Sequence, residues 1–322
     1  MQEGKNITRF AKSSLLQGIA TTTLVFSIPL LFEELSWAYA IIPLPVLYYL
    51  ISQGQQKGAA TITYAAIAAG VIAILVNSVA VLLFSFTLLP LGFSLARSVR
   101  RQQDPVQSGA AAILVLAITW VMFWTLYGSW RHTNPYSDIL QSLDNAMETA
   151  YSIYVESAAL SEALQQQTDV AYQKLRVFLP KVFPALLLGS VCSIVWLNLL
   201  LGHGLLKKNK PSLSPWKNYR DWRLPEALVW GVILAIIAMF FPLGAVETLG
   251  LNSIIILGLL YFFQGMAVLS TLLQKWSLPT PFKLLIYVLI VVQAYGIILL
   301  AILGFMDVWL GFGKDNQPKT LT

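Results

Sequence analysis

Apolar runs long enough to cross a lipid bilayer follow one another along almost the whole chain. A transmembrane helix needs about 20 mostly apolar residues, within a range of roughly 17–25. Eight such runs lie at residues 13–32, 60–77, 79–98, 108–129, 179–205, 226–244, 250–273 and 282–308. A ninth run, at residues 36–51, is shorter and contains two prolines, so it suits either a kinked span or a re-entrant segment. The sequence therefore predicts an all-α, polytopic integral membrane protein with about nine transmembrane helices.

The composition supports a membrane location and argues against binding to nucleic acid. Hydrophobic residues make up 57% of the chain and charged residues only 11%, whereas a soluble domain carries about 25% charged residues. The net charge is +6, but the cations lie in short loops between apolar runs. In such loops they set the orientation of the protein and meet anionic lipid headgroups. We therefore expect membrane lipids, and no nucleic acid, as partners.

A basic loop between two apolar runs fixes the predicted orientation. Its cations are Lys207, Lys208, Lys210, Lys217, Arg220 and Arg223. Because cytoplasmic loops carry an excess of Lys and Arg, we assign this loop to the cytoplasm. Nine spans with a cytoplasmic N-terminus then place 15 of the 21 Lys and Arg residues inside. This count makes residues 36–51 a span, keeps residues 13–32 as an uncleaved first span, and predicts an extracytoplasmic C-terminus.

The apolar runs divide the chain into three regions. Residues 1–130 form an N-terminal membrane region of about five spans, and residues 180–322 a C-terminal one of about four. Between them, residues 131–179 form an extracytoplasmic insert in which apolar residues recur every three or four positions, as in a helix. Its second helical stretch, residues 161–178, is expected to lead straight into the next span. The apolar stripe fits a linker resting on the membrane or a docking surface for an envelope protein.

Side chains suited to catalysis or metal binding are scarce. The topology places the two histidines, His132 and His203, on opposite membrane faces, so they cannot share a metal site. Nor does a histidine lie deep in a span, where it could activate a serine nucleophile. Glu33 and Glu34 resemble the glutamate pair of CAAX-protease-like membrane enzymes, but Ala38 stands where those enzymes need arginine. We therefore expect no enzyme, no metal and no cofactor.

The predicted spans contain almost no ionisable side chains. Asp307 lies near the outer end of the last run, close to Trp309, and tryptophan is typical of the membrane interface. We expect the last helix to end near Gly304, so that Asp307 meets water. A proton pump with a buried carboxylate relay is therefore not expected.

Four amide side chains are the polar candidates of the membrane region: Asn198, Asn252, Gln264 and Gln293. Counting from the span ends puts three of them, all but Asn252, roughly 10–17 Å deep. Such amides can line a solute pocket, or hydrogen-bond between helices at about 0.6–2 kcal/mol each. Gln264 and Gln293 lie on consecutive spans, so we expect them to face each other or a shared cavity.

Short runs in the C-terminal third resemble a known family. The runs are Trp222-Arg223-Leu224-Pro225 with Leu228-Val229-Trp230, Gly250-Leu251-Asn252, Tyr261-Phe262-Phe263-Gln264-Gly265 and Gly304-Phe305-Met306-Asp307. With them the chain resembles the YybS-like family of bacterial integral membrane proteins (domain of unknown function 2232). That family is distantly similar to the substrate-binding subunits of energy-coupling-factor transporters. The resemblance implies a bacterial inner-membrane protein that binds or helps to transport a small solute.

One feature of those subunits is missing from this chain. They commonly carry alanines four residues apart on the first span, where their energising partner docks, and here Gly18 and Ala20 stand among threonines. Two functions thus stay open: a non-catalytic solute-binding or transport-type component, and a structural or assembly protein that docks an envelope partner through residues 131–179. A solute binder needs a pocket between its spans, and a scaffold needs an exposed apolar stripe.

Overall fold

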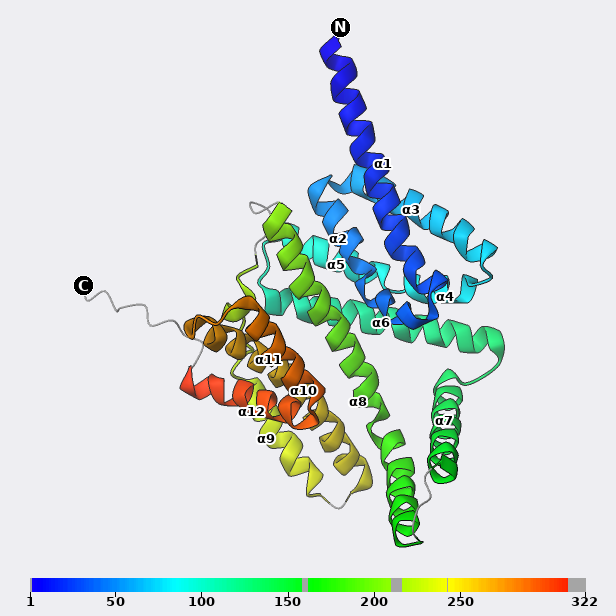
Figure 1. Ribbon diagram of the computed structural model, residues 1–322, viewed down its shortest axis with the longest axis vertical. Helices are drawn as coiled ribbons and strands as arrows, with labels where there is room; N and C mark the ends of the chain where they lie inside the picture. The colour runs from blue at the N-terminus through cyan, green and yellow to red at the C-terminus, as the bar shows by residue number, and fades with distance from the viewer. Residues whose placement is uncertain (1, 158–161, 210–215, 242, 312–322) are drawn as a thin grey trace, which may run out of the picture.

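The computed structural model describes residues 2–157, 162–209, 216–241 and 243–311, and within these ranges it consists of helices and their connections (Figure 1). The helices are α1 (Gln2–Leu31), η1 (Glu33–Ile41), α2 (Pro43–Ser52), α3 (Gln55–Leu75), α4 (Val79–Phe86), α5 (Leu89–Arg100), α6 (Pro105–Arg131), α7 (Pro135–Ser157), α8 (Glu162–Asn209), η3 (Tyr219–Asp221), α9 (Leu228–Met239), α10 (Gly244–Lys275), α11 (Thr280–Val292) and α12 (Ala294–Leu310). The predicted all-α fold class is confirmed.

Each predicted apolar run coincides with one or more helices of the described residues, but these helices differ in length. Six helical stretches are long and apolar enough to cross a membrane: Glu33–Ser52, Gln55–Leu75, Val79–Arg100, Pro105–Arg131, Leu164–Asn209 and Gly244–Lys275. The bent pair α11 and α12 makes a seventh if it is one broken span. Two shorter apolar helices, Leu15–Leu31 and Leu228–Met239, occupy two more of the predicted runs. The described residues thus form a multi-pass protein in which six or seven stretches, rather than nine, have the length of a full crossing.

The last apolar run is not the single span that its hydropathy predicts. Gln293 has an extended backbone (φ −90°, ψ 120°) between α11 and α12, and the two helices meet at an angle of 103°. After this break α12 packs across α10 and continues to Leu310, so the expected helix end near Gly304 is wrong. A run of apolar residues carries no signal for one extended residue in its middle. The predicted extracytoplasmic C-terminus depended on counting this run as one full span. Because the run is bent, that count no longer places the C-terminus.

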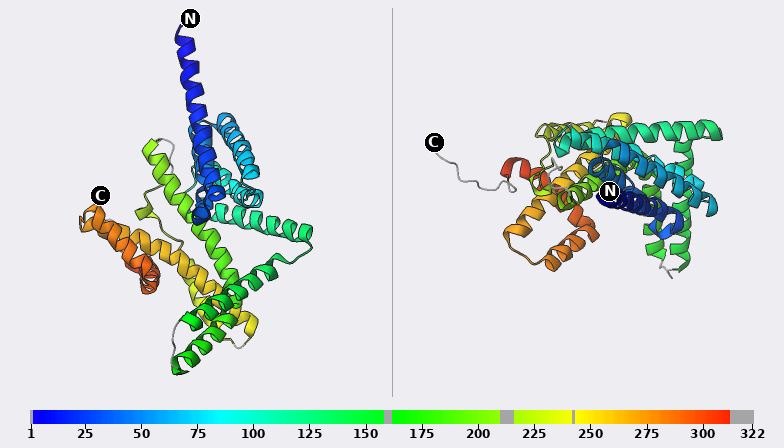
Figure 2. Two further views of the ribbon diagram at one scale, coloured as in Figure 1. Left: turned by 45° about the vertical axis from the view of Figure 1, so that its right-hand side comes forward. Right: turned by 90° about the horizontal axis from the view of Figure 1, so that it is seen from above.

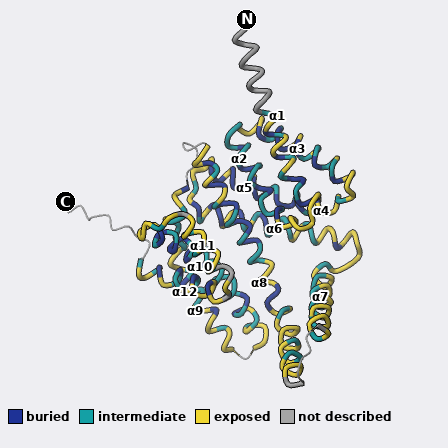
Figure 3. The backbone as a smooth tube through the Cα atoms, viewed as in Figure 1, coloured by how far each residue is buried: buried dark blue, intermediate teal, exposed yellow. Residues whose placement is uncertain are grey.

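The long helix α8 lies between two groups of helices. The N-terminal group, α1 to α6, has a continuous apolar core that includes the fully buried Phe26, Leu91 and Leu116. A smaller core around Leu273 and Leu300 holds α10, α11 and α12 together. α8 packs against α2 and α6 on one side and α10 on the other. Figure 3 shows the buried residues gathered on the inward faces of both groups.

Helix α7 folds back along the first part of α8 as an antiparallel hairpin. The Tyr151 hydroxyl donates a hydrogen bond to the Asp169 carboxylate, and the Tyr151 ring stacks on Tyr172 at 4.5 Å. Nearer the bundle, Arg176 pairs with Asp144 at 2.6 Å. The hairpin lies at the end of the molecule farthest from the N-terminus (Figures 1 and 2).

The hairpin tests what the sequence predicts for the insert. α8 runs from Glu162 to Asn209 without interruption, which confirms the predicted continuity between insert and span. Apolar side chains of the predicted stripe, among them Leu143, Met147 and Tyr151, are half-buried. Because Tyr151 packs on α8, the contacts inside the hairpin use at least part of this stripe.

Candidate functional site

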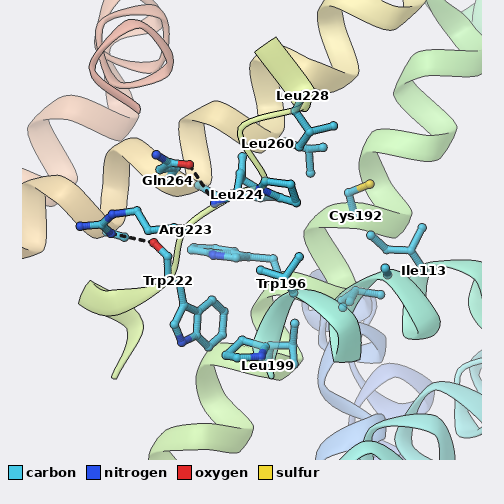
Figure 4. A pocket seen from close by; sticks show the side chains of 18 of the residues that line it. Ile113, Cys192, Trp196, Leu199, Trp222, Arg223, Leu224, Leu228, Leu260 and Gln264 are labelled. Carbon is cyan, nitrogen blue, oxygen red and sulfur yellow. Dashed lines mark hydrogen bonds between the residues drawn. The ribbon is translucent and has the colours of Figure 1, made fainter. Parts of the chain in front are cut away.

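A cleft of about 310 Å³ lies where α6, α8 and α10 meet (Figure 4). From α6 it is lined by small and apolar residues such as Gly109, Ala110 and Ile113. α8 contributes Cys192 and Trp196, and α10 contributes Leu260, Phe263, Gln264 and Ala267. The remaining wall comes from the chain between α8 and α9. The cleft therefore lies between the N-terminal and C-terminal groups of helices.

Residues 216–227, here called the connecting segment, form that wall with little regular structure beyond the single turn of η3. Side chains of the segment fix it to two helices. The Trp216 indole donates to Ser108 Oγ of α6 at 3.1 Å, the Tyr219 hydroxyl donates to the carbonyl of Phe263, and Arg220 Nε donates to Ser270 Oγ at 3.2 Å. The segment thus runs along the C-terminal half of α10 instead of remaining a loose loop.

An ion pair between a partly exposed arginine and a buried carboxylate holds the same segment to α12. Arg223 Nε lies 3.0 Å from Asp307 Oδ2, and the Asp307 side chain is fully buried. Gln264 bridges the two elements, because its Nε2 donates to Asp307 Oδ2 at 3.2 Å and its Oε1 accepts from the backbone N–H of Leu224 at 3.1 Å. We call Arg223, Gln264, Asp307 and the N–H of Leu224 the Asp307 cluster. A buried carboxylate requires such a partner and such hydrogen bonds.

The Asp307 cluster corrects two expectations. Asp307 does not meet water, because it is 2% exposed and paired. Arg223 and Asp307 were expected at opposite membrane faces, and instead they are in contact. The reason is structural: the connecting segment lies along the C-terminal half of α10, and α12 bends back across α10 after Gln293.

Two glycines let α10 and α12 approach until their backbones touch. A Cβ atom added at Gly304 would lie 2.0 Å from the carbonyl oxygen of Tyr261, and one at Gly265 would lie 1.9 Å from that of Leu300. Only residues without a Cβ allow this approach, as at other close contacts between membrane helices. Three of the short runs singled out in the sequence, at residues 222–225, 261–265 and 304–307, therefore meet at this place.

Asn252 restores the hydrogen bonds that a proline opens in α8. Pro184 lies inside that helix, and a proline ring displaces the neighbouring turn. Asn252 Nδ2 donates to the carbonyl of Lys181 at 2.7 Å, and its Oδ1 accepts from the N–H of Ala185 at 2.8 Å. In a regular helix these two backbone groups would bond to each other. Asn252 thus joins α10 to α8 at the proline.

The other two amide candidates are placed differently. Asn198 is fully buried and donates from Nδ2 to the carbonyls of Ala40 and Ile194, so it links α8 to η1. Gln293 is exposed at the break between α11 and α12. The expectation that it faces Gln264 is wrong, since the described partners of Gln264 are Leu224 and Asp307.

The cations of the basic loop serve different purposes. Arg220 and Arg223 bind within the protein, as described above, and Lys207 Nζ donates to Asn218 Oδ1 at 2.6 Å. Lys208 and Lys217 are exposed, and contact with lipid headgroups remains a prediction for them. Lys210 lies outside the described residues.

Six or seven helical stretches of the described residues, with the length and apolar composition of a membrane crossing, define a multi-pass helical membrane protein. The model of the family described as "Predicted membrane protein (DUF2232)" matches residues 20–308, so the chain belongs to this family. The chain is also similar to the "Uncharacterized protein YybS" of Bacillus subtilis (strain 168), with 22% identity over 301 residues, which cover 92% of this chain and 94% of that protein. No solved structure matches the chain. The matched region includes the cleft and the whole Asp307 cluster.

Proposed function

We propose that the chain is a non-catalytic membrane protein that binds a small molecule in the cleft, as a solute-binding or transport-type component. The cleft itself carries the proposal. Ligand pockets have volumes of about 300–1,000 Å³ and are mostly apolar with a few polar groups. The cleft, of about 310 Å³ between three long helices, has a volume and a lining that suit a small ligand. The distant similarity to transporter subunits supports the same function by analogy only.

The single cysteine of the chain provides a direct test, because Cys192 lines the cleft. The purified protein would react with N-ethylmaleimide in the presence of a panel of small uncharged, cationic and anionic compounds. Only the unoccupied fraction reacts, so a ligand at ten times its Kd should slow alkylation of Cys192 by roughly tenfold. The rate is measured by mass spectrometry of the modified peptide.

The matched control moves the cysteine along the same helix. In a Cys192→Ser background, Leu201→Cys places the thiol on α8 at a residue that is 41% exposed and outside the cleft lining. Its alkylation should not respond to the compounds. If no compound in the panel slows Cys192, or if every protective compound also slows the control, binding in the cleft is rejected.

We further propose that the protein lies in the bacterial cytoplasmic membrane, with its N-terminus and the end of α8 in the cytoplasm and the α7–α8 hairpin outside. The excess of basic residues near Asn209 supports this orientation. The hairpin and Asn209 lie at opposite ends of α8 (Figure 1). In a Cys192→Ser background, Ser137→Cys should react with a membrane-impermeant maleimide in intact cells, and Asn209→Cys only after permeabilisation. Equal labelling of both sites in intact cells would contradict this topology.

A second candidate function is docking of an envelope protein on the hairpin. It is supported by exposed apolar side chains there, including Ile153 (60% exposed) and Val177 (63% exposed). A chain that acts only through this surface would show no compound-dependent change at Cys192. The alkylation experiment therefore separates the two candidates.

A further inference from the structure

We infer that the cleft selects an uncharged, flat, apolar compound, and this inference rests on the proposed function. Four aromatic side chains line the cleft: Trp196, Tyr219, Trp222 and Phe263. Trp196 and Phe263 stack almost in parallel, with ring centroids 4.6 Å apart and an interplanar angle of 3°. Tyr219 meets Trp196 obliquely at 6.0 Å and Trp222 edge-on at 5.2 Å. These rings come from α8, α10 and the connecting segment.

Such a wall favours a flat ligand over a bulky one. Aromatic rings pack best in offset stacks or edge to face, and the four lining rings already use both arrangements among themselves. The α6 side of the cleft is apolar and contains Gly109 and Ala110 beside Pro105, Val106 and Ile113. A fused ring system can therefore stack on the aromatic side chains and contact the apolar α6 side at the same time. A saturated molecule of the same size is thicker and cannot stack.

The charged and amide groups beside the cleft are already bonded within the protein. Gln264 uses its Oε1 for Leu224 and its Nε2 for Asp307. The positive charge of Arg223 is balanced by Asp307, and Figure 4 shows the Arg223 side chain directed away from Cys192 and Ile113. The Tyr219 hydroxyl donates to Phe263. Among the described lining residues, none is left to balance the charge of a ligand.

A compound that carries a net charge should therefore not bind in the cleft. Moving an ion out of water is costly unless a counter-ion or several hydrogen bonds receive it. The remaining polar groups of the lining, the Trp196 indole and the Cys192 thiol, are uncharged. Because α6, α8 and α10 each contain a stretch able to cross a membrane, the ligand class consists of fused-ring compounds that dissolve in lipid.

The test compares three probes of one shape on the full-length protein. Fluorene is flat and uncharged, perhydrofluorene is its saturated analogue, and a fluorene carboxylate adds one negative charge. Alkylation of Cys192 by N-ethylmaleimide is the readout. Fluorene at ten times its Kd should slow the reaction roughly tenfold, while each of the other two, at the same concentration, should slow it less than about twofold.

Two tryptophan variants connect the effect to the aromatic wall. Trp196→Leu removes one ring of the stacked pair, so protection by fluorene should fall to that of perhydrofluorene. Trp230→Leu is the matched control, because Trp230 is 68% exposed on α9 and outside the cleft lining. It should retain full protection. If Trp196→Leu fails to fold, Trp222→Leu replaces it.

The outcomes separate this inference from the proposed function. Equal protection by perhydrofluorene overturns the preference for a flat ring, and equal protection by the carboxylate overturns the exclusion of charge. Both results would still place a ligand in the cleft. Protection by none of the three probes overturns the inference. The proposed function is also rejected if no compound of the whole panel protects Cys192, or if every protective compound slows the control cysteine as well.

Discussion

Asp307→Asn should destabilise the protein by about 1.5–3 kcal/mol, because Arg223, whose side chain is 27% exposed, loses its counter-ion and a charge-assisted hydrogen bond. The substituted side chain keeps the shape of aspartate and removes only the charge. The loss should appear as a lower midpoint of thermal unfolding for the detergent-purified protein. It should also speed alkylation of Cys192, because the connecting segment would lose its attachment to α12 and no longer close the cleft.

A charge-free pair provides the critical comparison. Replacing both partners, Arg223→Met with Asp307→Leu, removes the unpaired charge and should recover part of the stability. Asp221→Asn is the control, since Asp221 lies on the same segment but is exposed. It should unfold like the unmodified protein. The double variant is compared with the single variants Arg223→Met and Asp307→Leu. If the stability losses of these two single variants simply add in the double variant, the ion pair does not hold these elements together.

Gly304→Ala should disrupt the contact between α10 and α12. The new Cβ would lie 2.0 Å from the carbonyl oxygen of Tyr261, and backbone atoms cannot rotate out of its way. Overpacking costs about 1–3 kcal/mol where side chains can yield, so we expect at least the upper part of that range. Separating the helices would also draw Asp307 away from Arg223. Thermal unfolding of the purified variant measures the effect.

Another glycine of α10 serves as the control for this prediction. A Cβ added at Gly258 meets no atom within 4 Å. Gly258→Ala should therefore leave stability unchanged or raise it by up to about 1 kcal/mol, since alanine favours a helix. Similar unfolding temperatures for Gly258→Ala and Gly304→Ala would show that the close approach of the two helices is not required.

Hydropathy predicted the architecture because the length of an apolar run is a local property. It predicted an all-α, multi-pass chain and the continuous passage from the insert into α8. It could not predict the Asp307 cluster, whose members lie far apart: Gln264 and Asp307 alone are separated by 43 residues. The signal in the sequence that could have revealed the cluster was the charge of Asp307 within an apolar run. An ionisable residue in an apolar run is costly unless it has a partner, and Arg223 was present in another of the short runs.

For the amides, the sequence left two roles open because depth alone does not tell which way a side chain points. Asn198 and Asn252 bond to other helices, and Gln264 bonds to the connecting segment and α12. Gln293 was misplaced because its depth was counted along a straight helix. One extended residue, Gln293 itself, turned the chain by 103°.

The unbroken α8 also gives this molecule the mechanics of a lever. Its 48 residues correspond to about 72 Å measured along the helix axis, from the hairpin to Asn209. A force that tilts the outer arm must either flex the helix at Pro180 or Pro184 or move the Cys192 and Trp196 wall beyond them. Asn252 bonds to the backbone on both sides of Pro184, so bending of α8 at Pro184 would break both of these hydrogen bonds. Tilting of the hairpin arm would therefore meet resistance to bending at Pro184 and would move the α8 wall of the cleft.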